Sequence, residues 1–246
     1  MIEEVLPDSV VAVESRGDDA ACHAVLHPEE EAVVARAVEK RRREFTAVRA
    51  CARQAMAKLG VQPQAVLPGE RGAPTWPEGL RGSMTHCDGY RAAALVRATD
   101  LASLGIDAEP HGPLPDGVLR SVALPAELER LAVLDAKHPA VHWDRLLFST
   151  KECVYKAWFP LTGKWLDFED ADIEFHQDQE NQDQEDQNQN QDQDQDQDLG
   201  SLPQGSFRAE LLVPGPLVGG RRIGVFEGRW IIRQGLVITA LTVPHP

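Results

Sequence analysis

Residues 28–60 carry a pattern typical of helix in the first half of the chain. Pro28 is followed by three glutamates, which is a common helix start because proline fits the first turn and carboxylates favour the positive end of the helix dipole. Gly60 is placed to end the helical region. Apolar residues recur at helical spacing within it, and these are Phe45, Val48, Ala52, Met56 and Leu59.

A basic stripe runs beside that apolar face, formed by Arg42, Arg49 and Arg53. Stripes of this kind are usually solvated. Arg41 falls on the apolar side of an ideal helix. We therefore expect either that the helix breaks near Arg43 or that Arg41 reaches across an interface.

A second helical pattern covers residues 143–158. Its apolar side chains gather on one side of a helical wheel, and these are Trp143, Leu146, Leu147, Val154, Ala157 and Trp158. The other side carries Arg145, Ser149, Glu152 and Lys156. The pattern predicts that these polar residues face away from the core.

Strict alternation predicts a strand near the middle of the chain. Leu104, Ile106 and Ala108 alternate with Gly105 and with two acidic residues, Asp107 and Glu109. In an extended strand the apolar set faces a core and both carboxylates leave from the other face.

Further strands are expected towards the end of the chain. Residues 171–175 and 206–213 alternate like an antiparallel pair, and residues 230–243 are interpreted as a closing hairpin that turns at Gln234-Gly235. Residues 83–87 are interpreted as a loop that enters a strand at 91–96.

The stretch from Gln177 to Asp198 contains only Gln, Asn, Asp and Glu. Such a composition cannot bury enough apolar area to offset the entropy of ordering the chain, so residues 177–200 are expected to be a disordered loop. A partner-binding acidic tail is the less favoured interpretation. Because closure entropy grows slowly with loop length, the fold can tolerate this insert between two strands.

Composition narrows the class of protein. The chain has 246 residues, 42% of them hydrophobic, with neither a secretory leader pattern nor a stretch of ~20 apolar residues, which favours a soluble cytoplasmic protein. Residues 177–198 hold nine of the 39 acidic residues and no Lys or Arg, which leaves 30 acidic against 25 basic residues elsewhere. This balance does not suit a nucleic-acid binder. The four dispersed cysteines form no C-x-x-C pair, so free thiols are expected.

Asp107, Glu109 and Glu152 are the candidate site for a cation. Two carboxylates side by side repel each other unless a positive charge lies between them, and oxygen ligands suit a hard cation such as Mg²⁺. Gly105 and Ala108 are small and are expected to let a ligand approach the strand. Each feature alone is weak, because a Glu and a Lys four residues apart are usually a solvated surface pair.

Four stretches of the chain match one protein family in order: residues 41–53, 82–87, 105–110 and 148–168. With them the chain resembles the surfactin-type 4'-phosphopantetheinyl transferases, in particular the actinobacterial branch related to enterobactin synthase component D. The likeness covers residues 28–243 apart from the polar insert. The resemblance implies an α+β fold of two halves related by a pseudo-twofold axis, with the active site at their interface.

The resemblance also implies a division of labour between the halves. Residues 1–104 would hold the phosphates of coenzyme A, and residues 105–246 would supply the metal site and the catalytic helix. The implied coenzyme A contacts are Arg41, Arg49, Arg71, Ser83, His86 and Lys156. Pro68 stands where some relatives place a lysine, so one phosphate contact is either missing or taken over by Arg71.

The implied metal ligands are Asp107, Glu109 and Glu152, which would hold Mg²⁺ against the pyrophosphate. Glu152 would accept the proton of the attacking serine. Lys156 would stabilise or protonate the departing phosphate, and the sequence leaves both roles open. Cys153 stands where relatives commonly have a small residue such as Ala.

The implied activity is that of a holo-[acyl-carrier-protein] synthase. The enzyme would transfer the 4'-phosphopantetheine arm of coenzyme A to a serine of apo acyl or peptidyl carrier proteins and release 3',5'-ADP. A monomer is expected, without nucleic-acid or membrane partners. Trp165 and Phe168 could receive the carrier protein or the pantetheine arm, or simply pack under a loop. Two other functions stay open: a non-catalytic coenzyme A or nucleotide-binding module, and a Mg²⁺-dependent phosphohydrolase.

Overall fold

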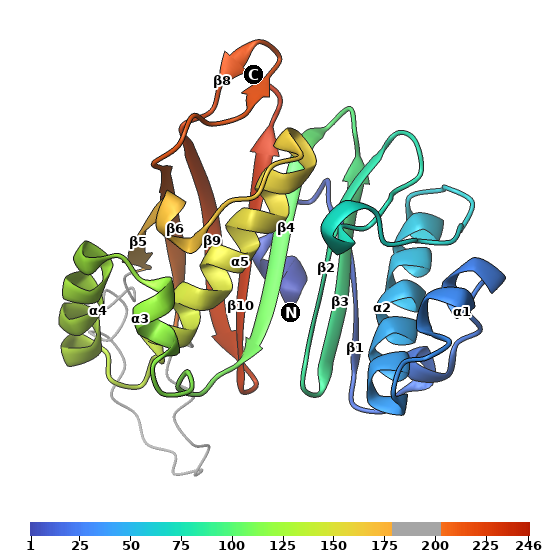
Figure 1. Cartoon of the computed structure of the whole chain (residues 1–246), viewed down its shortest axis with the longest axis horizontal. Coiled ribbons are helices and arrows are strands. Elements are labelled where there is room, and N and C mark those ends of the chain that lie inside the picture. Colours follow the sequence, from blue (N-terminus) through green and yellow to red (C-terminus); the bar gives the residue numbers. More distant parts are fainter. Residues whose placement is uncertain (179–202) are drawn as a thin grey trace, which may run out of the picture.

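In the first part of the chain a long helix packs on a three-stranded antiparallel sheet (Figure 1). The structure is a computed structural model of the whole chain and describes residues 1–178 and 203–246. The strand order is β1-β3-β2. Its elements are β1 (Val11–Arg16), α1 (Pro28–Val34), α2 (Glu39–Lys58), β2 (Leu80–Cys87) and β3 (Tyr90–Arg97), with short 3₁₀ turns at Ile2–Val5, Ala20–His23 and Glu70–Gly72.

The helical stretch that begins at Pro28 is interrupted before α2. Ala35 ends α1, and Val38 has an extended backbone with φ −64° and ψ 154° just before α2 begins. The helix continues through Arg43, so the expected break is absent, and Arg41 contacts His86 of β2. Gly60 follows the end of α2 with φ +69°, as expected for a glycine that terminates a helix.

Residues 83–87 are strand and not loop, so that interpretation was wrong. They lie in β2, which pairs with β3 from Leu80 opposite Arg97 to Cys87 opposite Tyr90. The two-residue turn Asp88-Gly89 joins the strands, and Gly89 has φ +73°. An Asp-Gly pair is a strong hairpin signal because glycine adopts this left-handed conformation without strain.

The second part of the chain forms a five-stranded antiparallel sheet in the order β4-β10-β9-β6-β5, with α5 lying across it (Figure 1). The predicted pairing of residues 171–175 with 206–213 is confirmed, as is the hairpin around Gln234-Gly235. The elements are β4 (Leu101–Pro110), α3 (Val118–Val122), α4 (Pro125–Lys137), α5 (Trp143–Thr162), a 3₁₀ turn (Phe168–Asp170), β5 (Ala171–Gln177), β6 (Gln204–Leu211), β7 (Leu217–Val218), β8 (Arg221–Arg222), β9 (Val225–Arg233) and β10 (Leu236–Pro244).

Two cores lie on opposite faces of β4. Leu104, Ile106 and Ala108 pack with residues of β3 and β10, as the alternation predicted. The other face of the second sheet packs against α5, where Trp143 and Trp230 are almost fully buried. The mixed α and β class is therefore confirmed. Because β4 begins at Leu101 and pairs along its length with β10, a boundary between residues 104 and 105 falls inside a strand.

Three smaller expectations can be compared with the described residues. All four cysteines are free thiols. No helix in residues 1–178 or 203–246 has the length and apolar character needed to cross a membrane. The expected disordered loop at 177–200 lies outside the described residues, apart from Gln177, which ends β5, and Asp178.

Candidate active site

Side-chain hydroxyls join the two sheets where β2 meets β4. Ser83 Oγ accepts a hydrogen bond from the Ile106 amide at 3.1 Å, and Thr85 Oγ1 accepts one from the Ala108 amide at 3.1 Å. Both hydroxyl residues are buried. They satisfy amides at the edge of β4 that have no strand partner on this side, since β2 and β4 belong to different sheets. We call this contact the seam.

Gly105 allows α5 to approach the seam closely. A Cβ atom at this position would lie 2.1 Å from the carbonyl oxygen of Cys153 in α5. The small residue therefore makes room for the helix backbone, and the expectation that Gly105 opens the strand to a ligand was wrong. Cys153 lies on this contact and donates from Sγ to the Gly105 carbonyl at 3.1 Å. This approach fixes where Glu152 and Lys156 lie relative to β4.

Asp107 and Lys156 form an ion pair at the seam. Lys156 Nζ donates to Asp107 Oδ1 at 2.6 Å and to the Ile106 carbonyl at 3.2 Å, and Thr85 Oγ1 donates to the same Oδ1 at 3.1 Å. Asp107 Oδ2 is buried and has no hydrogen-bond partner among the described residues. Burial would lower the pKa of Lys156, but the adjacent Asp107 carboxylate raises it above its usual value.

Glu109 lies two residues further along β4 and is held by Arg145 of α5. Arg145 donates to Glu109 Oε2 at 3.1 Å and to the carbonyls of Gly112 and Pro113 at 3.1 and 2.7 Å. Burial raises the pKa of Glu109 to about 7, repulsion from Asp107 adds to the rise, and Arg145 opposes it. The Glu109 carboxyl group therefore ionises less readily than a solvated one, although Arg145 is paired with it.

Glu152 lies on the same side of α5 as Arg145 and Lys156. Burial raises its pKa, an effect that Lys156 opposes and Asp107 reinforces. The polar side of α5 does not face away from the fold, so that expectation was wrong. Its member Ser149 is fully buried and its hydroxyl pairs with that of Thr239 in β10 at 3.0 Å. The helical wheel identified the polar side of α5 but could not show that strands cover it.

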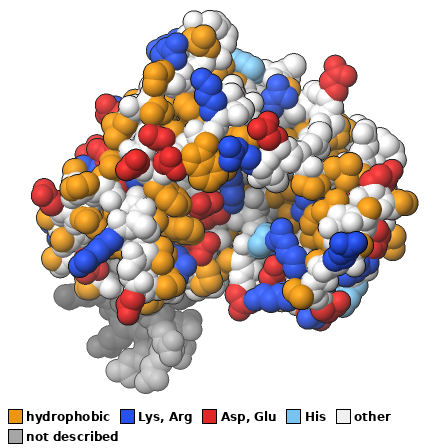
Figure 2. All heavy atoms as spheres, viewed as in Figure 1, with side chains coloured by type: hydrophobic (Ala, Val, Ile, Leu, Met, Phe, Trp, Pro, Cys, Tyr) orange, Lys and Arg blue, Asp and Glu red, His pale blue; other side chains and the backbone are white. Residues whose placement is uncertain are grey.

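A cleft of about 540 Å³ lies between the two parts of the molecule. The surface is hollowed there, and basic and histidine side chains gather along it (Figure 2). Seven of the nine predicted site residues line the cleft, and these are Arg41, Arg49, Arg71, Ser83, His86, Glu152 and Lys156. Asp107 and Glu109 are not in its lining, although Asp107 contacts it through Lys156.

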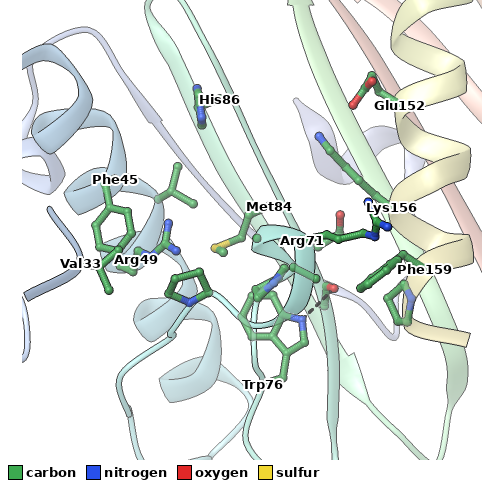
Figure 3. Close-up of a pocket in the computed structure, with 18 of the residues that line it drawn as sticks. Val33, Phe45, Arg49, Arg71, Trp76, Met84, His86, Glu152, Lys156 and Phe159 are labelled. Carbon is green, nitrogen blue, oxygen red and sulfur yellow. Dashed lines mark hydrogen bonds between the residues drawn. The ribbon is translucent and has the colours of Figure 1, made fainter. Parts of the chain in front are cut away.

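The cationic side of the cleft comes from α2 and β2, opposite α5 (Figure 3). Arg41 Nη1 lies 2.9 Å from His86 Nε2, and His86 Nδ1 lies 3.9 Å from a carboxylate oxygen of Glu44. The pKa of His86 is lowered because the ring loses hydration and because Arg41 is positive, while Glu44 opposes the shift.

Two further arginines lie at the cleft. Arg49 is buried, stacks over the Phe45 ring at 3.5 Å, and donates from Nε to the Val66 carbonyl at 3.3 Å. Burial lowers its pKa to about 10, so it stays charged at neutral pH. Arg71 lies over the Trp165 ring at 5.3 Å and has the left-handed φ of +53°. Arg71 thereby connects a loop of the first part to a loop of the second.

A smaller cavity of about 240 Å³ adjoins the cleft on the far side of Glu152. Its walls are mainly apolar and include Tyr155, Trp165 and Phe168, while Glu152 and Tyr155 line both cavities. Trp165 is 52% exposed and stacks against Tyr155, with ring centroids 5.0 Å apart. The two predicted aromatic residues therefore form part of a cavity wall.

Comparison with known proteins identifies the family. A model of the 4'-phosphopantetheinyl transferase N-terminal domain matches residues 29–96, and a model of the 4'-phosphopantetheinyl transferase superfamily matches residues 103–207. The 4'-phosphopantetheinyl transferase Svp of Streptomyces mobaraensis is 53% identical, covering 100% of this chain and 90% of the relative. The chain belongs to the 4'-phosphopantetheinyl transferase family.

Two other members of the family are similar over most of their length. The transferase Npt of Nocardia iowensis is 48% identical over 98% of this chain and 99% of the relative. The transferase PptT of Mycobacterium tuberculosis is 44% identical over 88% of this chain and 85% of the relative. The resemblance stated from motifs alone is thereby confirmed.

The donor atoms of this 4'-phosphopantetheinyl transferase fit a divalent cation whose coordination is completed by other ligands. Among residues 1–178 and 203–246, no cluster of three His, Cys, Asp or Glu side chains is arranged to hold a metal ion. Mg²⁺, however, is usually bound by one or two carboxylates together with substrate phosphates and water. The unpartnered Asp107 Oδ2 and the carboxylates of Glu109 and Glu152 are oxygen donors of the kind that such a site uses.

The sequence did not identify all the side chains at this transferase's site. Thr85 lies in the matching stretch 82–87 but was not predicted as a site residue, although its hydroxyl contacts both β4 and Asp107. Tyr155 and Trp76 line the cleft and were not singled out. The signals were weak, because an aromatic residue at helical spacing and a threonine in a strand are ordinary core residues.

Proposed function

We propose that the chain transfers the 4'-phosphopantetheine moiety of coenzyme A to a serine hydroxyl of an apo acyl or peptidyl carrier protein. The supporting observation is that one cleft brings Glu152 and the Lys156–Asp107 pair opposite Arg41, Arg49 and His86 in a member of this family. We further propose that the protein acts as a cytoplasmic monomer.

The cationic side of the cleft suits the phosphates of coenzyme A. Arg41 can donate further hydrogen bonds to an incoming phosphate, and His86 can donate from Nε2 once the ring is protonated. Arg49 adds a buried charge. Arg71 is assigned to the same ligand, and its stacking on Trp165 places its guanidinium across the cleft. Ser83 can still donate its hydroxyl hydrogen, although its oxygen already accepts a hydrogen bond from the Ile106 amide.

Transfer requires the serine oxygen to bond to the phosphorus that bears pantetheine while the bond to the 3',5'-ADP oxygen breaks. Glu152 would accept the serine proton, since its pKa is raised and it lies between the two cavities. Lys156 is an ammonium beside Asp107 and would stabilise the negative charge on the departing phosphate. Mg²⁺ held by Asp107, Glu109 and Glu152 would supply further neutralisation of the phosphate oxygens.

The apolar cavity beside Glu152 suits the pantetheine arm. This arm extends from the pyrophosphate, carries no charge and ends in a thiol, so mainly apolar walls of Tyr155, Trp165 and Phe168 favour its burial. Simple packing of Phe168 is also observed, because its ring lies 6.0 Å from that of Phe148.

The proposal is tested by incubating the protein with coenzyme A, Mg²⁺ and an apo carrier protein, followed by intact mass measurement of the carrier. We expect a phosphopantetheine adduct on one serine and loss of that product in Glu152→Gln. Binding of coenzyme A without any adduct would favour the binding module. Phosphate release without an acceptor would favour the phosphohydrolase. The named relatives favour neither alternative.

A further inference from the structure

Thr85 makes two contacts with β4 through one buried hydroxyl group. The oxygen accepts the Ala108 amide at 3.1 Å, and the hydroxyl hydrogen is then free to be donated to Asp107 Oδ1 at 3.1 Å. The residue is 3% exposed and is absent from the lining of the cleft. Its hydroxyl is therefore committed to the strand and to the carboxylate rather than to a ligand.

These contacts leave one oxygen of the Asp107 carboxylate hydrogen-bonded and the other without a hydrogen-bond partner. Oδ1 accepts from both Thr85 and Lys156, while Oδ2 is buried without a partner. Two donors on the same oxygen restrict rotation of the carboxylate group about its own axis. A buried acceptor without a hydrogen-bond partner lowers the stability of the fold. An Asp107 carboxylate held with Oδ2 in that state therefore indicates that this oxygen binds a ligand.

We propose that Thr85 is a positioning residue that orients Asp107 so that Oδ2 faces the divalent cation of the transfer reaction. This inference rests on the proposed function, since it assumes the same cation. Thr85 lies on β2 of the first half and Asp107 on β4 of the second, so the seam itself sets the direction of the carboxylate. Outer partners of metal ligands commonly change metal affinity by about 10- to 100-fold when they are removed.

The chain offers a matched set of variants. Thr85→Val keeps the side-chain shape and removes both hydrogen bonds, and Thr85→Ser keeps the hydroxyl. Ser103→Ala is the control, because Ser103 of β4 is another buried residue with a hydroxyl group. It donates to the Ala157 carbonyl at 2.8 Å and contacts none of the three carboxylates. Thermal melting of all three variants establishes that each is folded at the temperature of the binding measurements.

Mn²⁺ binding to the coenzyme A complex, measured by electron paramagnetic resonance without carrier protein, is the test. We expect Thr85→Val to weaken Mn²⁺ binding about tenfold or more, with Thr85→Ser and Ser103→Ala close to wild type. In the transfer assay, the loss in Thr85→Val should shrink as the Mg²⁺ concentration rises.

Wild-type Mn²⁺ affinity in Thr85→Val would overturn the positioning role while leaving the proposed function intact. An equal loss in Ser103→Ala would also overturn it, because it would show a general effect on the β4 backbone. Failure of the wild-type chain to bind Mn²⁺ would overturn the metal assignment, and the role of Thr85 with it.

Discussion

His86 is held between a cation and a carboxylate. A guanidinium group can only donate hydrogen bonds, so the His86 Nε2 that lies 2.9 Å from Arg41 must accept one. The proton of the neutral ring is therefore on Nδ1, on the side of Glu44. At the scale of single residues, loss of hydration and the positive charge of Arg41 hold the pKa of His86 below its usual value, while Glu44 opposes this shift.

Binding of 3',5'-ADP is predicted to be coupled to proton uptake by His86. The lowered pKa means that His86 is mostly neutral at pH 7 in the free protein, and a bound phosphate raises that pKa by attracting the charged form. Affinity should therefore rise as pH falls from 7 towards 6. Calorimetry in buffers of different ionisation enthalpy should show uptake that is reduced in His86→Gln. Equal uptake by the variant would exclude His86 as the proton acceptor.

At the scale of elements, the close approach of α5 to β4 determines the site. Gly105 allows this approach, and the buried Lys151 anchors the other side of the helix. Lys151 Nζ pairs with Glu127 of α4 at 2.8 Å and donates to the carbonyls of Phe168 and Ala171. The helix that carries Glu152 is thus connected on both sides.

Gly105→Ala is predicted to destabilise the protein by about 3 kcal/mol and to impair transfer. A Cβ atom 2.1 Å from the backbone oxygen of Cys153 must displace α5, and overpacking of this kind commonly costs 1–3 kcal/mol. Gly224→Ala is the control, since a Cβ atom there has no neighbour within 4 Å. Denaturant unfolding measures the free energy, and equal stability of the two variants would show that the Cβ atom does not displace α5.

Lys151→Met is predicted to lower the free energy of unfolding by about 3–5 kcal/mol, because it leaves the Glu127 carboxylate buried without its partner. Burial lowers the pKa of Lys151 while Glu127 opposes that shift, as expected for a buried pair. Arg208→Ala removes an exposed pair with Glu210 and should leave the free energy of unfolding almost unchanged, because solvent screens exposed pairs. A similar loss in the two variants would show that burial of the Lys151 pair is unimportant.

At the scale of the whole molecule, local patterns predicted the elements better than their packing. Alternation identified β4 and the helix period identified α5, because these signals depend only on nearby residues. The sequence could not show that α5 covers the carboxylate face of β4, or that Gly105 makes room for a helix. Both depend on contacts between residues about 50 positions apart, which periodicity does not encode.

For the same reason, the sequence predicted the residues of the site better than the side chains that orient them. Seven of its nine residues line one cleft, and all of these except Arg71 lie in the stretches that carry the family resemblance. The partners that orient them were not predicted: Thr85 acts on Asp107 from a strand of the other sheet, and Arg145 reaches Glu109 while also bonding two carbonyls beyond β4. Such partners depend on how elements far apart in the sequence pack against each other, so local sequence patterns do not reveal them.

We expect Asp107 to belong to the centre that transfers phosphopantetheine. The most direct measurement is the intact mass of an apo carrier protein after incubation with coenzyme A, Mg²⁺ and the wild-type chain, Asp107→Ala or the exposed control Asp116→Ala. We expect a phosphopantetheine adduct with wild type and Asp116→Ala, and none with Asp107→Ala, whose folding is checked by thermal melting. Undiminished modification by Asp107→Ala would contradict this expectation.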